Sequence, residues 1–183
     1  MDSGAQNYRR YLDGEETAFD AIIEELYSPL VFFLRRFSVD LDTAEDIAMD
    51  VFAELVLHPR RYNFKVSLKT YLFMLGRSRA LNYIKRRKKL LPLSDAEHLI
   101  WEGPSLEELV LTDQRKRSVN RALAQLEENQ RLAVHLVYFE QLSCGEAAKV
   151  MGKSTKQVYN LLYRAKQALR TILEEEDGLF DGF

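Results

Sequence analysis

The stretch from residue 143 to residue 169 is SCGEAAKVMGKSTKQVYNLLYRAKQAL, and it predicts two helices joined by a short turn. Ser143 and Ser154 stand where helix caps are expected, because a side chain able to reach back follows each of them three residues later. Gly152 can take the positive φ that ends a helix. A helix, a tight turn and a second helix make a helix-turn-helix, although an ordinary helical hairpin has the same pattern.

The second of these helices is expected to have two different faces. Its apolar residues recur at helical spacing and form one stripe, which would pack on the rest of the domain. On the other face, Asn160 can bond adenine and Arg164 can bond guanine in the major groove, while Lys156 and Lys166 can reach phosphates. The stripe consists of Val158, Leu161, Leu162, Ala165 and Leu169.

The rest of the chain also predicts helices, because apolar residues recur every three or four positions and no useful segment alternates with period two. Thr43 and Ser105 provide further cap signals. We therefore expect an all-α protein of two helical domains joined by a flexible acidic linker, the second domain containing the helix-turn-helix. The expected divisions are a helical domain at 1–89, a linker at 90–113 with a short helix near 106–111, a second domain at 114–173 and a frayed acidic tail at 174–183.

The composition excludes several classes of protein. With 183 residues, 46% hydrophobic and 30% charged, the chain has the balance of a folded protein rather than a disordered one. No apolar run approaches the roughly 18 residues of a membrane span, and the acidic-polar start does not resemble a secretion signal, so we expect a cytoplasmic protein. Cys144 is the single cysteine, the three histidines are scattered and no glycine-rich phosphate loop is present. We therefore expect no catalytic residues, no metal and no cofactor.

Charge is sorted along the chain although the net charge is only −2. Residues 55–94 contain 11 Lys or Arg and no Asp or Glu, which favours contact with a polyanion over a solvated surface. Aromatic residues alternate with these cations, as they do in grooves that hold single-stranded nucleic acid by base stacking. Some of the rings, at Tyr71, Phe73 and Tyr83, could instead belong to the core.

Just before this basic segment, Asp46, Asp50 and Glu54 recur every four residues on one helix face. Like charges at this spacing repel each other by a few tenths of a kcal/mol, about 0.2–0.5 per pair, so the stripe is better explained by a basic partner. A solvated face is the alternative. A carboxylate metal site is less favoured, because no histidine joins the stripe.

The order of these motifs resembles an RNA polymerase sigma factor of the extracytoplasmic-function (ECF) group. Residues 14–19 and 43–52 resemble the family's second region, which docks on the polymerase clamp. Residues 67–72 and 82–87 resemble its segment for reading and melting the −10 element. Residues 126–169 resemble its fourth region, which binds −35 duplex DNA.

The resemblance implies three sets of contact residues, core RNA polymerase and promoter DNA as partners, and an anti-sigma factor as a possible further partner. The alternative is a helix-turn-helix regulator that binds DNA without polymerase. The −35 set is Ser154, Thr155, Lys156, Gln157, Tyr159, Asn160, Tyr163, Arg164 and Lys166. The −10 set is Arg60, Arg61, Tyr62, Asn63, Phe64, Lys65, Tyr71, Ser78, Asn82 and Arg86, with Tyr62 facing the flipped base. The polymerase set is Glu45, Asp46, Asp50, Phe52 and Glu54.

Overall fold

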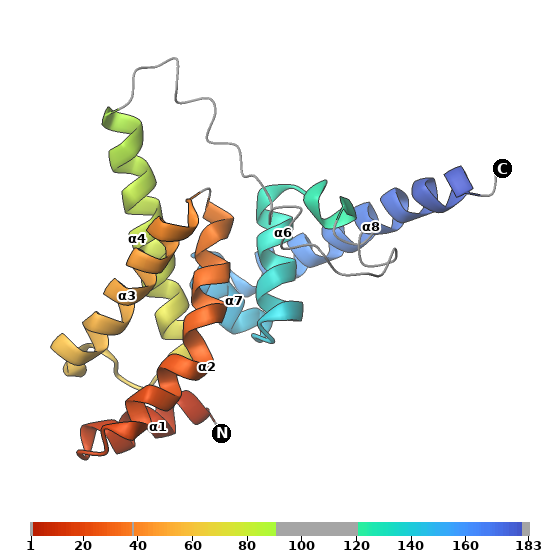
Figure 1. Ribbon diagram of the computed structural model, residues 1–183. Coiled ribbons are helices and arrows are strands. Elements are labelled where there is room, and N and C mark those ends of the chain that lie inside the picture. The colour runs from red at the N-terminus through yellow and green to blue at the C-terminus, as the bar shows by residue number, and fades with distance from the viewer. Residues whose placement is uncertain (1, 38, 91–120, 181–183) are drawn as a thin grey trace. The chain divides into compact units, whose positions relative to one another are not determined.

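The computed structural model describes residues 2–37, 39–90 and 121–180, and every regular element in these ranges is a helix (Figure 1). The chain forms two compact units, Met1–Trp101 and Glu102–Phe183. The predicted all-α, two-domain architecture is therefore confirmed. The predicted linker lies outside the described residues from residue 91 onward, as does the short helix near 106–111, so the domain boundaries stay a prediction.

The first unit is built around three helices, α2, α3 and α4, which pack against one another in pairs. Their apolar faces supply its core, and Phe73 is among the fully buried side chains, so this ring belongs to the core rather than to a stacking surface. The elements are α1 (Ser3–Leu12), α2 (Thr17–Leu34), the 3₁₀ turn η1 (Arg35–Phe37), α3 (Leu41–Leu57), the 3₁₀ turn η2 (Pro59–Arg61) and α4 (Leu68–Leu90).

Helix α1 was not predicted, because its few apolar residues are too sparse to form a clear helical period. It is held by contacts with distant parts of the chain. The Tyr8 hydroxyl donates a buried hydrogen bond to the Leu55 carbonyl (2.7 Å), and the Leu68 N–H at the start of α4 donates to Asp2 Oδ2 (2.6 Å). Asp2 thus satisfies one of the free N–H groups of another helix.

Helix α3 begins earlier than the sequence predicted. The expected cap was Thr43, but the N-cap is Asp40, whose side chain accepts a hydrogen bond from the Thr43 N–H (2.7 Å). Aspartate is among the strongest N-cap residues, and at position 40 its carboxylate reaches the free N–H three residues on. The prediction of Thr43 as the cap was therefore wrong.

Gly76 lets α4 approach α2 closely. A Cβ atom at this position would lie 3.0 Å from Leu30 Cδ1 and 3.2 Å from Leu34 Cδ2. Contacts this short leave no room for a side chain without movement of the two leucines. The glycine thus sets the position of the helix that carries four of the ten predicted −10 residues.

The second unit confirms the predicted helix-turn-helix. Ser143 caps its first helix in a reciprocal capping box with Glu146, and Gly152 ends that helix with a φ of 64°. A small buried cluster of Leu126, Val134 and Ala165 packs the second helix of the motif against the segments that precede the motif. The described elements of this unit are α6 (Glu128–Val134), the π-helical turn η4 (His135–Phe139), α7 (Cys144–Met151) and α8 (Thr155–Phe180).

Helix α8 is longer than predicted. The sequence was expected to fray after residue 173, whereas the helix continues to Phe180 and includes the acidic residues 174–177. Acidic residues are not favoured at the C-terminal end of a helix, but no proline or glycine interrupts the chain before Gly178. The expectation of a frayed tail from residue 174 was therefore wrong.

Candidate nucleic-acid interface

The early part of α8 presents one polar face and one apolar face, as predicted. All nine residues of the predicted −35 set are exposed, and the rings of Tyr159 and Tyr163 are more than half exposed. On the opposite side, Val158 and Ala165 are fully buried. A helix with this division can lie in a groove without disturbing its own packing.

The start of α8 uses two of these nine residues for its own stability. The Ser154 N–H donates to Gln157 Oε1 (2.8 Å), and the Gln157 N–H donates to Ser154 Oγ (3.2 Å). This reciprocal pair is a capping box, and it occupies the Gln157 side chain. Of the seven residues that remain, Asn160 and Arg164 carry the amide and guanidinium groups that can bond base edges in a bidentate way.

Helix α4 carries a second exposed stripe. Ser78, Asn82 and Arg86 recur every four residues and are all exposed, so they lie above one another on one face of the helix. Tyr71, earlier on the same helix, is half-buried, and its ring lies tilted against that of Tyr62 with a ring-centroid distance of 5.0 Å. The structure therefore brings three predicted −10 residues into one row.

Tyr62 does not face outward as predicted. Its side chain is 2% exposed, and its hydroxyl donates to the Val66 carbonyl (2.7 Å). Its ring lies between those of Tyr8, Phe64 and Tyr71, with centroid distances of 5.7, 4.6 and 5.0 Å. Aromatic rings from α1, the loop and α4 converge here and bury it. In this arrangement the ring of Tyr62 supports the loop and is not open to a base.

The outer side of this loop is basic. Arg60, Arg61, Asn63 and Lys65 are all exposed, and the Asn63 side chain accepts a hydrogen bond from the Lys65 N–H (3.1 Å). Phe64, at the tip, has a φ of 59°, which is uncommon for a residue with a side chain. The loop therefore presents the cations of Arg60 and Lys65 outward, whereas Arg61, although exposed, pairs with Glu54.

Arg9 is a neighbour of this loop that the sequence did not predict. Its guanidinium lies over the Phe64 ring at 4.7 Å from the centroid, a cation–π contact. The two residues are far apart in sequence, and no motif links them. Helix α1 thus brings another exposed cation next to the predicted −10 loop.

The two buried phenols predict how the first unit behaves in alkali. Burial, the largest influence in each case, raises the pKa of Tyr8 and that of Tyr62 from 10.0 to about 12. An unfolded chain loses these protons nearer pH 10, so their contribution to stability is complete below that pH and is lost as the pH rises toward 12. Among the nine tyrosines, we expect Tyr8 and Tyr62 to give the latest phenolate transitions in ultraviolet absorbance, accompanied by unfolding.

Two variants identify these transitions. Tyr62→Phe should remove one late transition, and Tyr8→Phe should remove the other. Ionisation of all tyrosines near pH 10 in a chain that stays folded would contradict the prediction.

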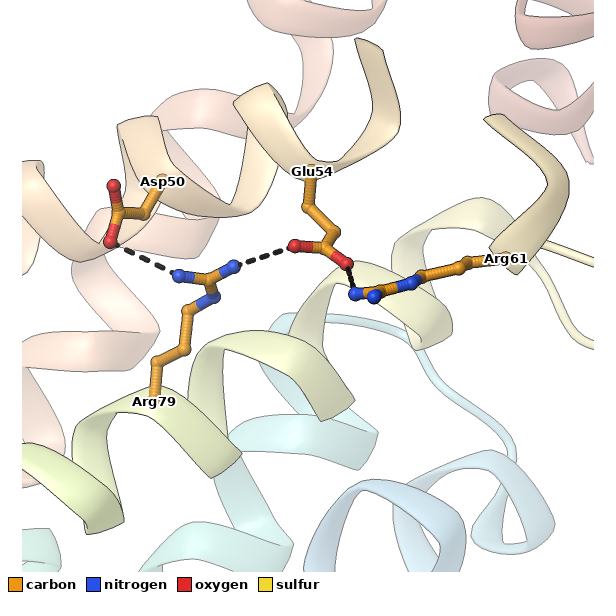
Figure 2. A network of polar contacts seen from close by, with 4 residues as sticks. All are labelled: Asp50, Glu54, Arg61 and Arg79. Carbon is orange, nitrogen blue, oxygen red and sulfur yellow. Dashed lines mark hydrogen bonds and ion pairs between the residues drawn. The ribbon is translucent and has the colours of Figure 1, made fainter. Parts of the chain in front are cut away.

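Two of the three carboxylates in the acidic stripe on α3, those of Asp50 and Glu54, pair with arginines of the same unit (Figure 2). Arg79 of α4 reaches Asp50 Oδ2 at 3.1 Å and Glu54 Oε2 at 2.9 Å. The other Glu54 oxygen pairs with Arg61 in η2. Burial raises the pKa of the Glu54 carboxyl most strongly, but Arg61, His58 and Arg79 together outweigh it and hold the pKa below its ordinary value. The network is therefore charged at neutral pH and weakens only in acid.

Three of the five predicted polymerase contacts have roles inside this unit. Asp50 and Glu54 pair with the arginines just described, so the basic partner that the stripe required is at least partly internal. Phe52 is 4% exposed and packs near Phe19 and Tyr27. An apolar ring on the inner face of a helix joins the core, which is why Phe52 does not face outward. Asp46 is exposed and Glu45 is half-buried.

Helix α3 also exposes apolar side chains that the sequence analysis did not select. Met49 is 60% exposed, Val56 44% and Leu57 71%. Met49 and Val56 lie seven residues apart and therefore share a face of the helix. Exposed apolar residues gathered on one helix are typical of a surface that binds another protein.

Two further features of the described ranges bear on function. No group of three or more His, Cys, Asp or Glu side chains in them is arranged to hold a metal ion. None of their helices is both long and apolar enough to cross a membrane.

Comparison with known proteins gives two matches that together cover most of the chain. Residues 22–90 match the family model for Sigma-70 region 2, and residues 116–169 match that for Sigma-70 region 4. The RNA polymerase sigma-H factor of Pseudomonas aeruginosa is 25% identical over 179 residues, covering 92% of this chain and 93% of that protein. The ECF RNA polymerase sigma factor SigM of Bacillus subtilis is 26% identical over 157 residues, covering 84% and 93%.

A solved structure shares the fold. It is the sigma factor RpoE of Bartonella quintana in complex with the anti-sigma factor NepR. The TM-score is 0.65 at 21% identity, over 85% of this chain and 96% of that one. Helix α1 lies before the region 2 match, so its contacts with the loop are not part of that match.

Proposed function

Because the chain belongs to the RNA polymerase sigma factors of the ECF group, we propose that its two units read different elements of one promoter. Sigma factors are DNA-binding transcription initiation factors that bind core RNA polymerase, and they are not enzymes. The second unit would bind the −35 duplex, and the first would hold the melted −10 strand. Both steps take place in the cytoplasm, where the polymerase acts.

The observation that carries this proposal is the division of α8 into two faces. Asn160 and Arg164 are exposed one turn apart, and Val158 and Ala165 behind them are fully buried. In the major groove, these two side chains can bond adenine and guanine edges. Lys156 and Lys166 flank them and supply phosphate contacts that position the helix.

The first unit supports capture of a single strand through two neighbouring features. The row of Ser78, Asn82 and Arg86 on α4 offers hydroxyl, amide and guanidinium groups to unpaired base edges and phosphates. The loop of residues 60–65 adds cations along the same unit. Tyr83, 36% exposed on α4, is better placed than Tyr62 to stack on a base.

The polymerase-binding surface would lie on the exposed part of α3. Asp46 supplies charge there, and Met49, Val56 and Leu57 supply apolar area. A central apolar cluster with a charged rim is the usual anatomy of a protein interface. The solved relative bound to an anti-sigma factor suggests that a protein of that kind could also bind this chain.

The experiment is a selection from duplex DNA with two randomised blocks, using the full chain reconstituted with core polymerase. We expect two enriched sequences at a fixed spacing, and transcription that starts at a defined distance downstream of them. The chain without polymerase serves as the control.

Failure of the chain to remain with polymerase would contradict the proposal. A single enriched block that appears equally without polymerase would instead identify a helix-turn-helix regulator that acts alone.

A further inference from the structure

Two guanidinium groups from different elements converge on one carboxylate of α3. Arg79 of α4 binds Glu54 Oε2 at 2.9 Å, and Arg61 of η2 binds Glu54 Oε1, so both oxygens of Glu54 are used (Figure 2). Asp50 contacts only Arg79, at 3.1 Å. Among the four residues, Glu54 alone connects three elements.

The two carboxylates differ in exposure. The Glu54 side chain is 11% exposed, whereas that of Asp50 is 68% exposed. Exposed ion pairs contribute little, about 0.2–1 kcal/mol, because water and salt screen them. Glu54 is shielded on most sides, so its two pairs are screened less and hold their geometry more firmly. Because Glu54 is largely covered by its neighbours, it also has little exposed surface with which to contact polymerase.

The elements that Glu54 joins are those that carry the predicted −10 contacts. Arg61 directly precedes Tyr62, whose ring is packed beneath the loop. Arg79 directly follows Ser78, the first residue of the exposed row on α4. The position of the loop relative to that row therefore depends on the Glu54 carboxylate.

Removing the negative charge of Glu54 would break the ion pairs that it makes with Arg61 and Arg79. Arg61 would have no carboxylate partner among the contacts described for it, and Arg79 would retain only the exposed Asp50. The guanidinium groups of Arg61 and Arg79, which Glu54 holds close together, would then repel each other. The chain that follows Arg61 is not helical, so it has fewer backbone hydrogen bonds than α3 or α4 to hold it in place.

We propose that Glu54 is a positioning residue for capture of the −10 strand: by binding Arg61 and Arg79 together, it holds the loop of residues 60–65 at a set distance from the row on α4. It acts through the two arginines and touches neither DNA nor polymerase. This inference rests on the proposed function of the first unit.

The test compares Glu54→Gln with Asp50→Asn, in the full chain bound to core polymerase. The two changes remove the same charge from the same helix, one turn apart, and both touch Arg79, but only the first releases Arg61. The probe is a single-stranded oligonucleotide carrying the −10 sequence selected as described above. We expect Glu54→Gln to bind it roughly 3- to 30-fold more weakly, the range typical of coupled neighbouring residues, and Asp50→Asn to bind within about 2-fold of the parent.

Further measurements separate positioning from other roles. The affinity for core polymerase and the thermal midpoint should be nearly unchanged in Glu54→Gln. Glu54→Asp, whose shorter side chain cannot hold both arginines, should resemble Glu54→Gln. Arg61→Gln combined with Glu54→Gln should cost less than the two single losses together, because both break the same pair.

Several results would overturn the proposal. Equal losses for Glu54→Gln and Asp50→Asn would reflect net charge alone. Loss of polymerase affinity would return Glu54 to the polymerase surface, and a general fall in stability would give it a merely structural role. If the parent holoenzyme itself failed to bind the oligonucleotide, the proposed function of the first unit would fail, which is a different outcome from these.

Discussion

Replacing Tyr62 by alanine is expected to destabilise the first unit by about 3–5 kcal/mol, the usual cost of removing a large buried aromatic side chain. The ring is 2% exposed and lies among three other rings, so its loss leaves a cavity that α1, the loop and α4 must all adjust to fill. If the ring served only to stack on a base, its removal would leave the stability of the free protein unchanged. The measurement is hydrogen exchange of the slowest amides of the first unit.

Two control variants give this result its meaning. Tyr62→Phe keeps the ring and loses the hydrogen bond to the Val66 carbonyl, which should cost about 1 kcal/mol. Lys65→Ala, at an exposed position in the same loop, should change stability by no more than about 0.5 kcal/mol. Wild-type stability in Tyr62→Ala, together with loss of single-strand binding, would contradict the supporting role and favour a base contact.

Replacing Arg164 or Asn160 by alanine is expected to weaken binding to the selected −35 duplex by about 1–3 kcal/mol each, or roughly 5- to 150-fold. Both side chains project from the exposed face of α8, so neither change should disturb the packing of Val158 and Ala165. Because only the selected duplex has the base that these side chains contact, only binding to that duplex depends on the contact. Binding of the polymerase-bound chain to random duplex should therefore change little.

Lys156 and Lys166 provide the contrast. Both are exposed on the same helix, and we expect them to contact phosphate. Their alanine variants should weaken binding to all duplexes alike. Each should also reduce the steepness of the plot of log binding constant against log salt concentration by about 0.9. Equal losses on selected and random duplexes for Arg164→Ala and Asn160→Ala would show that α8 does not read sequence.

The features predicted best from the sequence are those set by neighbouring residues. The caps at Ser143 and Ser154 and the turn at Gly152 depend on side chains and backbone within three residues, and all three are as predicted. The two faces of α8 follow from helical periodicity in the same way. At the start of α3 the helix begins at Asp40 rather than at the predicted Thr43, because aspartate is the stronger N-cap residue.

The features that sequence reasoning missed depend on contacts between distant residues. Arg79 is 25 positions from Glu54, and no spacing rule pairs them. Aromatic residues were the most ambiguous, because a ring suits a core and a stacking surface equally, and only the packing shows Tyr62 and Phe52 to be buried. Helix α1 has too few apolar residues for a periodic signal, and its position depends on hydrogen bonds from Tyr8 and to Asp2.

The central claim, that each unit reads its own promoter element, is tested most directly by pairing protein variants with DNA variants. The polymerase-bound chain, its Arg164→Ala variant and its Asn82→Ala variant are each measured on the selected promoter and on versions altered only at −35 or only at −10. We expect Arg164→Ala to lose discrimination at −35 and to keep it at −10, and Asn82→Ala to do the reverse. If each variant lost discrimination at both elements alike, the division of the promoter between the two units would be contradicted.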